Sequence, residues 1–152
     1  MPDILWVDDE IHMLKGHLLF LEGKGYSFQT CNNGSDAIEL FANTAFDAVF
    51  LDENMPGLSG LEVLEEMKSI RPETPIVMIT KSEEEQIMEM AIGSKIADYL
   101  IKPVNPNQVL LCLKKILKGK ELVSQKATRG YQQVFGKLTM EMQQLETWQE
   151  WS

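Results

Sequence analysis

Residues 48–57 read Ala48-Val49-Phe50-Leu51-Asp52-Glu53-Asn54-Met55-Pro56-Gly57. An apolar run stops at Asp52, and the Met-Pro-Gly that follows forces a loop. A run that is apolar at every position, rather than at every second one, is typical of a strand buried on both faces. The stretch therefore predicts a central strand of a parallel sheet with an acidic residue at its carboxyl end.

The same alternation of short apolar runs and helical patterns extends on both sides of this stretch. We expect five strands, at residues 4–7, 26–31, 48–51, 76–79 and 97–101. Helical patterns lie at residues 13–21, 36–41 with Ser35 as a cap, from Ser59-Gly60 onward, from 82 to about 93, and at 106–117. Strands that alternate with helices predict βαβ units, and hence an α/β fold with helices on both faces of a parallel sheet.

Four of the five expected strands are followed by a polar residue with a chemical role. Asp8 and Asp9 follow the first strand, Asp52 the third, Thr80 the fourth and Lys102 the fifth. Because ligands of open parallel sheets bind beyond the carboxyl ends of the strands, we expect these side chains to converge.

Clustered carboxylates repel one another unless a cation lies between them, and carboxylate and carbonyl oxygens are the ligands that Mg²⁺ prefers. A lysine and a hydroxyl add donors for phosphoryl oxygens. One carboxylate would then be the acceptor, since acyl phosphates on Asp are an established covalent intermediate. Each residue taken alone is as well explained as a helix cap or loop residue, but the whole set at these strand ends favours a phosphoryl site.

Four segments closely resemble the receiver domain of bacterial response regulators: Val7-Asp8-Asp9-Glu10, Leu51-Asp52-Glu53-Asn54-Met55-Pro56-Gly57, Ile79-Thr80 and Tyr99-Leu100-Ile101-Lys102-Pro103. The resemblance covers residues 3 to 118. It implies a flavodoxin/CheY-like, doubly wound, five-stranded parallel sheet in the order 2-1-3-4-5. It also implies that Asp52 accepts a phosphoryl group from a sensor histidine kinase in a Mg²⁺-dependent reaction.

The resemblance also implies roles for the residues around the acceptor. Asp9 and Asp52 would be Mg²⁺ ligands together with the backbone carbonyl of Asn54, and Asp8 would hold the metal through water. Thr80 and Lys102 would contact the phosphoryl oxygens.

Two further residues would belong to the switch that follows phosphorylation. Tyr99 would be the switch aromatic coupled to Thr80; a half-buried strand aromatic is the less favoured alternative. Pro103 would follow a cis peptide bond that aims Lys102 at the site. The surface of the fourth helix, fifth strand and fifth helix would change and control an output domain or partner.

One residue departs from the family pattern. Most receivers have Ala or Gly after the threonine, whereas this chain has Lys81. A long cation there would either crowd the phosphoryl site or add a charge to it.

Longer pieces resemble a Bacteroidetes subgroup of response regulators, the PorX type. These pieces are residues 51–56, 78–85 and 97–108. In that subgroup a PglZ-type, alkaline-phosphatase-like domain follows the receiver, and its members are linked to type IX protein secretion. The resemblance implies that an output domain is absent from this chain.

We therefore expect a receiver domain at residues 1–119 and a helical linker at 120–152. The linker has an apolar stripe near heptad spacing, made of Tyr131, Phe135, Leu138, Met142, Leu145 and Trp148. This stripe needs an apolar partner, and we expect a homodimer in which the linker takes part; a frayed linker is the alternative.

Charge and cysteine content limit the remaining options. The formal net charge is -9, which disfavours nucleic-acid binding. Two distant cysteines, no secretion signal and no long apolar run predict a cytoplasmic chain without membrane insertion.

The alternative from the enzyme class is a haloacid-dehalogenase-like phosphatase with an Asp nucleophile. That class needs an Asp two residues after the nucleophile, and this chain has Asn54 there. We therefore expect a signalling domain rather than an enzyme that turns over a separate substrate.

Overall fold

A computed structural model describes residues 1–81 and 95–118 of the chain. The sheet consists of β1 (Asp3–Val7), β2 (Ser27–Cys31), β3 (Ala48–Asp52), β4 (Ile76–Thr80) and β5 (Asp98–Ile101). The helices are η1 (Ile11–Leu14), α1 (Lys15–Gly23), α2 (Gly34–Asn43) and α3 (Gly60–Ile70), and residues 106–118 are also helical. The expected helix at 82–93 and the expected linker at 120–152 lie outside the described residues.

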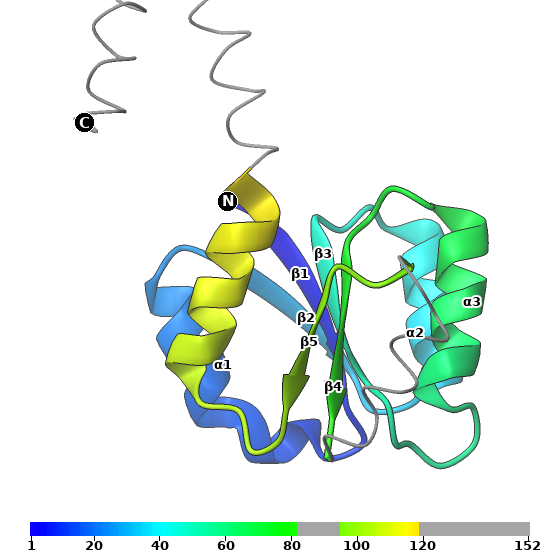
Figure 1. Cartoon of the computed structure of the whole chain (residues 1–152), viewed down its shortest axis with the longest axis horizontal. Coiled ribbons are helices and arrows are strands. Elements are labelled where there is room, and N and C mark those ends of the chain that lie inside the picture. Colours follow the sequence, from blue (N-terminus) through cyan, green and yellow to red (C-terminus); the bar gives the residue numbers. More distant parts are fainter. Residues whose placement is uncertain (82–94, 119–152) are drawn as a thin grey trace, which may run out of the picture. The chain divides into compact units, whose positions relative to one another are not determined.

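All strand pairs are parallel, and the strand order is β2-β1-β3-β4-β5. The predicted α/β fold and its 2-1-3-4-5 order are therefore confirmed. Figure 1 shows α1 and the yellow helix at residues 106–118 on one face of the sheet, and α2 with α3 on the other. Residues Met1–Ile116 belong to one compact unit.

Both faces of the central strands are buried, as their unbroken apolar runs predict. On the face of α2 and α3, alternate residues of β1 and β3 pack into a cluster with α3 that includes Leu5, Val7, Val49, Leu51, Val63, Leu64 and Met67. On the opposite face, the rings of Trp6 and Phe50 lie 5.2 Å apart. Burying each such side chain stabilises the fold by about 1.5–3 kcal/mol.

Two predicted helix starts need correction. Helix α2 begins at Gly34, and its N-cap is Asn33, whose side chain accepts the N–H of Asp36; Ser35 is not the cap. A Cβ at position 34 would lie 2.5 Å from the Val63 side chain, so the close packing of α2 on α3 requires glycine there. The expected helix at 13–21 is a short 3-10 turn, η1, followed by α1.

Candidate functional site

The strand register brings the polar strand ends to one edge of the sheet. Val7 pairs with Leu51, so Asp8 lies beside Asp52 at the carboxyl edge. On the other side of β3, Asp52 pairs with Ile79. Thr80 pairs with Ile101, the residue before Lys102. The polar residues at these strand ends therefore lie at one edge of the sheet, as the sequence predicts.

Three carboxylates form the centre of the site. One ligand oxygen each of Asp8, Asp9 and Asp52 lies within 4.8 Å of the other two. Asp8 and Asp52 are almost fully buried, with 2% and 1% of their surface exposed, while Asp9 is more exposed. Buried like charges at this separation require a compensating cation.

Lys102 supplies part of that compensation. Its ammonium lies 3.2 Å from Asp8 Oδ2 and 3.4 Å from Asp52 Oδ1. Burial acts to lower the pKa of Lys102, but the carboxylates of Asp52 and Asp8 outweigh it, so the pKa is raised and the side chain stays charged. Three carboxylates and one ammonium still leave the site with a formal charge near -2.

The donor set fits a divalent hard cation. Asp52 Oδ1 accepts the Asn54 N–H at 3.2 Å, whereas the buried Oδ2 has no hydrogen-bond partner among the described residues. A buried carboxylate oxygen without a partner is unfavourable unless a ligand satisfies it. Asp8, Asp9 and Asp52 would hold Mg²⁺ with oxygen ligands alone, as this ion prefers.

Burial dominates the titration of Asp52. It raises the pKa of this carboxyl group, and Asp8 raises it further, while Lys102 and the Asn54 N–H act in the opposite direction; the resulting pKa is about 6. At mildly acidic pH, a fraction of the molecules therefore carries a proton on Asp52 when no metal is bound.

This raised pKa predicts a pH dependence of stability in the metal-free chain. Between about pH 4 and pH 6 the folded state keeps a proton on Asp52 that the unfolded state has lost, so stability falls as pH rises through this window and is level above it. The loss from this group is on the order of 2–3 kcal/mol. Asp52→Asn has no ionisable group at this position and does not lose this stability, so at pH 7 the mutant is expected to be more stable than the wild-type chain.

The measurement is urea unfolding of both chains in chelator from pH 4 to pH 8. Subtracting the two curves removes the contribution of the other acidic residues. A difference that stays constant across the window would contradict a raised Asp52 pKa.

A glycine shapes the loop that follows the acceptor. The Gly60 N–H donates to the Glu53 carbonyl, and a Cβ on Gly60 would lie 2.6 Å from the Asp52 carbonyl oxygen and the Glu53 Cα. Ser59 caps α3 in a capping box with Glu62, as the expected helix start at Ser59-Gly60 indicates. The close approach of α3 to the end of β3 was not apparent in the sequence.

The remaining predicted residues lie around this centre. Thr80 is buried at the end of β4. Tyr99 is half-buried, packs against the core cluster and faces the same side of the sheet as Thr80, because Thr80 pairs with Ile101 and side chains alternate along a strand. The Lys102–Pro103 peptide bond is cis, as expected.

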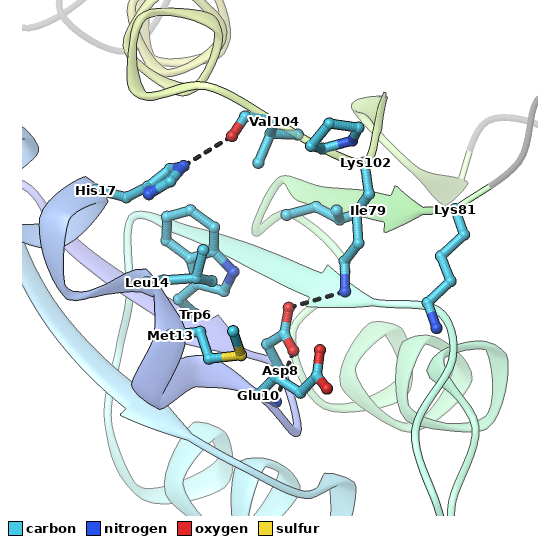
Figure 2. A pocket seen from close by; sticks show the side chains of 11 residues that line it. Trp6, Asp8, Glu10, Met13, Leu14, His17, Ile79, Lys81, Lys102 and Val104 are labelled. Carbon is cyan, nitrogen blue, oxygen red and sulfur yellow. Dashed lines mark hydrogen bonds and ion pairs between the residues drawn. The ribbon is translucent and has the colours of Figure 1, made fainter.

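Beside the carboxylates lies a pocket of about 530 Å³ (Figure 2). Its walls combine apolar and charged side chains from β1, η1, α1, β4 and the segment after β5; they are Trp6, Asp8, Glu10, Met13, Leu14, His17, Ile79, Lys81, Lys102, Pro103 and Val104. Lys81 is exposed and lies along this wall with Lys102, so it borders the site rather than filling it. The contact of His17 with Val104 was not predicted from the sequence.

No helix within the described ranges, 1–81 and 95–118, is long and apolar enough to cross a membrane. The described residues include free cysteines at positions 31 and 112.

A sequence model of the family described as "Response regulator receiver domain" matches residues 4–114. The transcriptional regulatory protein ResD of Bacillus subtilis is 33% identical over 115 residues, which are 76% of this chain and 48% of ResD. The alginate biosynthesis transcriptional regulatory protein AlgB of Pseudomonas syringae is 36% identical over 119 residues, which are 78% of this chain and 27% of AlgB. The chain thus spans about half or less of the length of these relatives.

Solved structures of receiver domains and response regulators are also similar to this chain. A CheY-like receiver domain protein from Methanospirillum hungatei has a TM-score of 0.71 at 28% identity, covering 80% of this chain and 97% of its own. The response regulator protein TrrA from Thermotoga maritima, in complex with Mg²⁺-BeF, has a TM-score of 0.69 at 31% identity, covering 77% of this chain and all of its own.

Proposed function

The chain belongs to the response regulator receiver family, and from that premise we propose that it accepts a phosphoryl group on Asp52 in a Mg²⁺-dependent reaction. The observation that supports this is the arrangement around Asp52. A buried carboxylate with one unpartnered oxygen lies beside two further carboxylates and 3.4 Å from a charged lysine.

Each residue of the site has a role in this proposal. Asp52 attacks the phosphorus of the donor, the donor's leaving group departs, and an aspartyl phosphate forms. Bound Mg²⁺ would supply the positive charge that neutralises the phosphoryl oxygens. Asp9, Asp52 and the Asn54 carbonyl would hold this ion, and Asp8 would act on it through water.

Lys102 and Thr80 are the protein donors to the phosphoryl oxygens. The Lys102 ammonium already lies against the Asp52 carboxylate, so little reorganisation is needed when the phosphoryl group arrives. Thr80 ends the neighbouring strand and carries a hydroxyl. Movement of Thr80 toward the phosphoryl group leaves space that Tyr99 fills, since both lie on one face of the sheet.

The direct test is incubation of the chain with acetyl phosphate and Mg²⁺, followed by intact mass measurement. One phosphoryl group adds about 80 Da. The haloacid-dehalogenase alternative receives no support from the site, because Asn54 cannot serve as its acid/base. A receiver domain is a signalling domain, and we propose that this chain catalyses only its own phosphorylation and dephosphorylation.

We propose that this chain acts in the cytoplasm and receives its phosphoryl group from a sensor histidine kinase. ResD and AlgB are transcriptional regulatory proteins in which the matched part is half or less of the chain. By analogy, this receiver controls an output domain or protein partner outside residues 1–119. The resemblance of segments 51–56, 78–85 and 97–108 supports a PglZ-type output of the Bacteroidetes, type IX secretion subgroup.

We further propose that the chain forms a homodimer, or becomes one on phosphorylation, with the linker at 120–152 taking part. Its apolar stripe needs a partner, and Leu111 on the preceding helix is 66% exposed. A symmetric two-fold contact is the commonest closed form. Sedimentation of the full chain and of a version ending at Gly119 is measured with and without beryllofluoride. The full chain is expected to dimerise in at least one of these conditions, and the shortened version is expected to dimerise more weakly. Monomers in every condition would contradict the proposal.

A further inference from the structure

One hydrogen bond ties α1 to the segment that carries Lys102. The Nε2 atom of His17 lies 2.7 Å from the carbonyl oxygen of Val104, a residue 87 positions later in the chain (Figure 2). Because a carbonyl oxygen can only accept, Nε2 must be the protonated ring nitrogen of His17. The bond is partly buried, so it does not have to compete fully with water.

We propose that His17 is a positioning residue for phosphoryl transfer, which holds the segment Lys102–Val104 so that the Lys102 ammonium stays on Asp8 and Asp52. This inference rests on the proposed function of Asp52. His17 itself is not placed near the reacting atoms and acts through Lys102.

The pocket explains why this segment needs a tether. Lys102, Pro103 and Val104 all line the cavity of about 530 Å³ that separates them from Met13 and Leu14. Over this stretch the cavity lies between the segment and η1. The Val104 side chain is buried, but Pro103 is exposed and Lys102 is half-buried, so packing holds the segment less firmly at these two residues. His17 reaches across one end of the cavity to the Val104 carbonyl (Figure 2).

Among the described residues, further hydrogen bonds hold the chain on either side of the segment. Before it, the Lys102 N–H donates to the Thr80 carbonyl. After it, Asn105 caps the helix at 106–118 through a reciprocal pair of hydrogen bonds with Gln108. The bond from His17 restrains the residues between these two anchors.

His17 is held by a rigid support. Its ring meets the Trp6 indole edge to face, with centroids 6.4 Å apart and planes at 89°. Trp6 is fully buried and packs on Phe50 and Phe28. Since Trp6 lies on β1 two residues before Asp8, the strand that supplies a site carboxylate also supports His17.

Release of this tether has two effects of opposite sign. If the Lys102 ammonium withdraws from the carboxylates, less positive charge competes with a metal ion, so Mg²⁺ binds more tightly. At the same time a donor to the phosphoryl oxygens is misplaced, so phosphorylation slows. General destabilisation of the fold would instead lower both the Mg²⁺ affinity and the phosphorylation rate.

The experiment compares the full wild-type chain with His17→Ala and His17→Gln. Calorimetric titration with Mg²⁺ gives the metal affinity, and mass measurement gives the rate of reaction with acetyl phosphate. His17→Ala is expected to slow the reaction roughly ten- to a hundredfold while Mg²⁺ binds a few-fold more tightly. His17→Gln is expected to remain near wild type, because its amide N–H can replace Nε2.

Lys102→Ala and the double variant show whether His17 acts through Lys102. Lys102→Ala should change both quantities in the same directions, with a rate loss of roughly 10²–10³. Adding His17→Ala to Lys102→Ala should change neither the Mg²⁺ affinity nor the reaction rate further, because the effects of coupled residues are not additive. Equal effects of His17→Ala in both backgrounds, or no effect in either, would overturn the inference.

The two proposals fail in distinguishable ways. If the wild-type chain takes up no phosphoryl group, the proposed function has failed, and the Mg²⁺ affinities of the four Ala-series chains (wild type, both single variants and the double variant) still test the coupling of His17 to Lys102. If the wild-type chain reacts and His17→Ala matches it in both rate and affinity, only the positioning role is wrong.

Discussion

Asp52→Asn is expected to gain no mass on incubation with acetyl phosphate and Mg²⁺, whereas the wild-type chain gains about 80 Da. The amide nitrogen and oxygen of asparagine are not nucleophiles for phosphorus. Asp52 is the most deeply buried of the three carboxylates, and its Oδ2 has no hydrogen-bond partner among the described residues. An oxygen in this state can accept a new bond without first losing an old one.

The matched control is Glu10→Gln. Glu10 is an exposed carboxylate on the wall of the same pocket, its backbone N–H donates to Asp8, and the substitution makes the same chemical change. This variant is expected to take up one phosphoryl group like the wild type. Circular dichroism should show the wild-type fold in both variants.

A mass gain that persists in Asp52→Asn would move the acceptor to another residue. The nearest alternatives are Asp8 and Asp9, which share the cluster. Peptide mapping of the adduct after borohydride trapping would then identify the residue. Loss of the adduct in Glu10→Gln as well would mean that charge near the pocket, rather than the nucleophile, limits the reaction.

The sequence was sufficient to place the main residues of this site because they obey a local rule. Each of β3, β4 and β5 is a short apolar run, and the polar residue at its end is visible in the chain: Asp52, Thr80 and Lys102. A parallel sheet then brings strand ends together whatever the details of packing. The order 2-1-3-4-5 came from the family resemblance, since periodicity alone does not specify strand order.

The features that the sequence did not predict depend on distances between segments. His17 contacts Val104 across 87 positions, and no periodic pattern marks either residue as a partner. Gly60 is required because the Asp52 carbonyl lies 2.6 Å from its ideal Cβ, which becomes apparent only when α3 is packed on β3.

The helix cap on α2 is a different kind of error. The sequence analysis gives Ser35 as the cap, whereas Asn33, two positions earlier, is a residue type that caps helices equally well. Packing decided between them, because the helix must begin at Gly34 to approach Val63 closely. Tertiary contact thus outweighed a local preference.

Removal of Mg²⁺ is expected to abolish phosphorylation by acetyl phosphate. The donor carries negative charge, and the site presents Asp8, Asp9 and Asp52. Among the described residues, the cation that forms ion pairs with these carboxylates is Lys102, so the metal-free site repels the donor. The ligand oxygens of the three carboxylates lie within 4.8 Å of one another, so their negative charges act together on the donor. A divalent cation held by these carboxylates would offset the remaining formal charge of about -2 and supply positive charge for the phosphoryl oxygens.

The measurement is the initial rate of adduct formation in Mg²⁺, in excess EDTA, and in EDTA followed by an excess of Mg²⁺. No adduct is expected in EDTA, and full recovery is expected when the metal is restored. Asp9→Asn removes one negative charge from the proposed metal site while leaving Asp52 and Lys102 in place. It is expected to raise the Mg²⁺ concentration at half-maximal rate about tenfold or more.

Equal rates in Mg²⁺ and in excess EDTA would show that Lys102 alone compensates the phosphoryl charge. The carboxylate cluster would then be a purely structural feature, held together by its lysine. The proposed chemistry separates these cases because Lys102 contacts Asp8 and Asp52 but forms no described ion pair with Asp9. Sensitivity to Asp9→Asn that disappears at saturating Mg²⁺ is therefore the result that only a metal-dependent site produces.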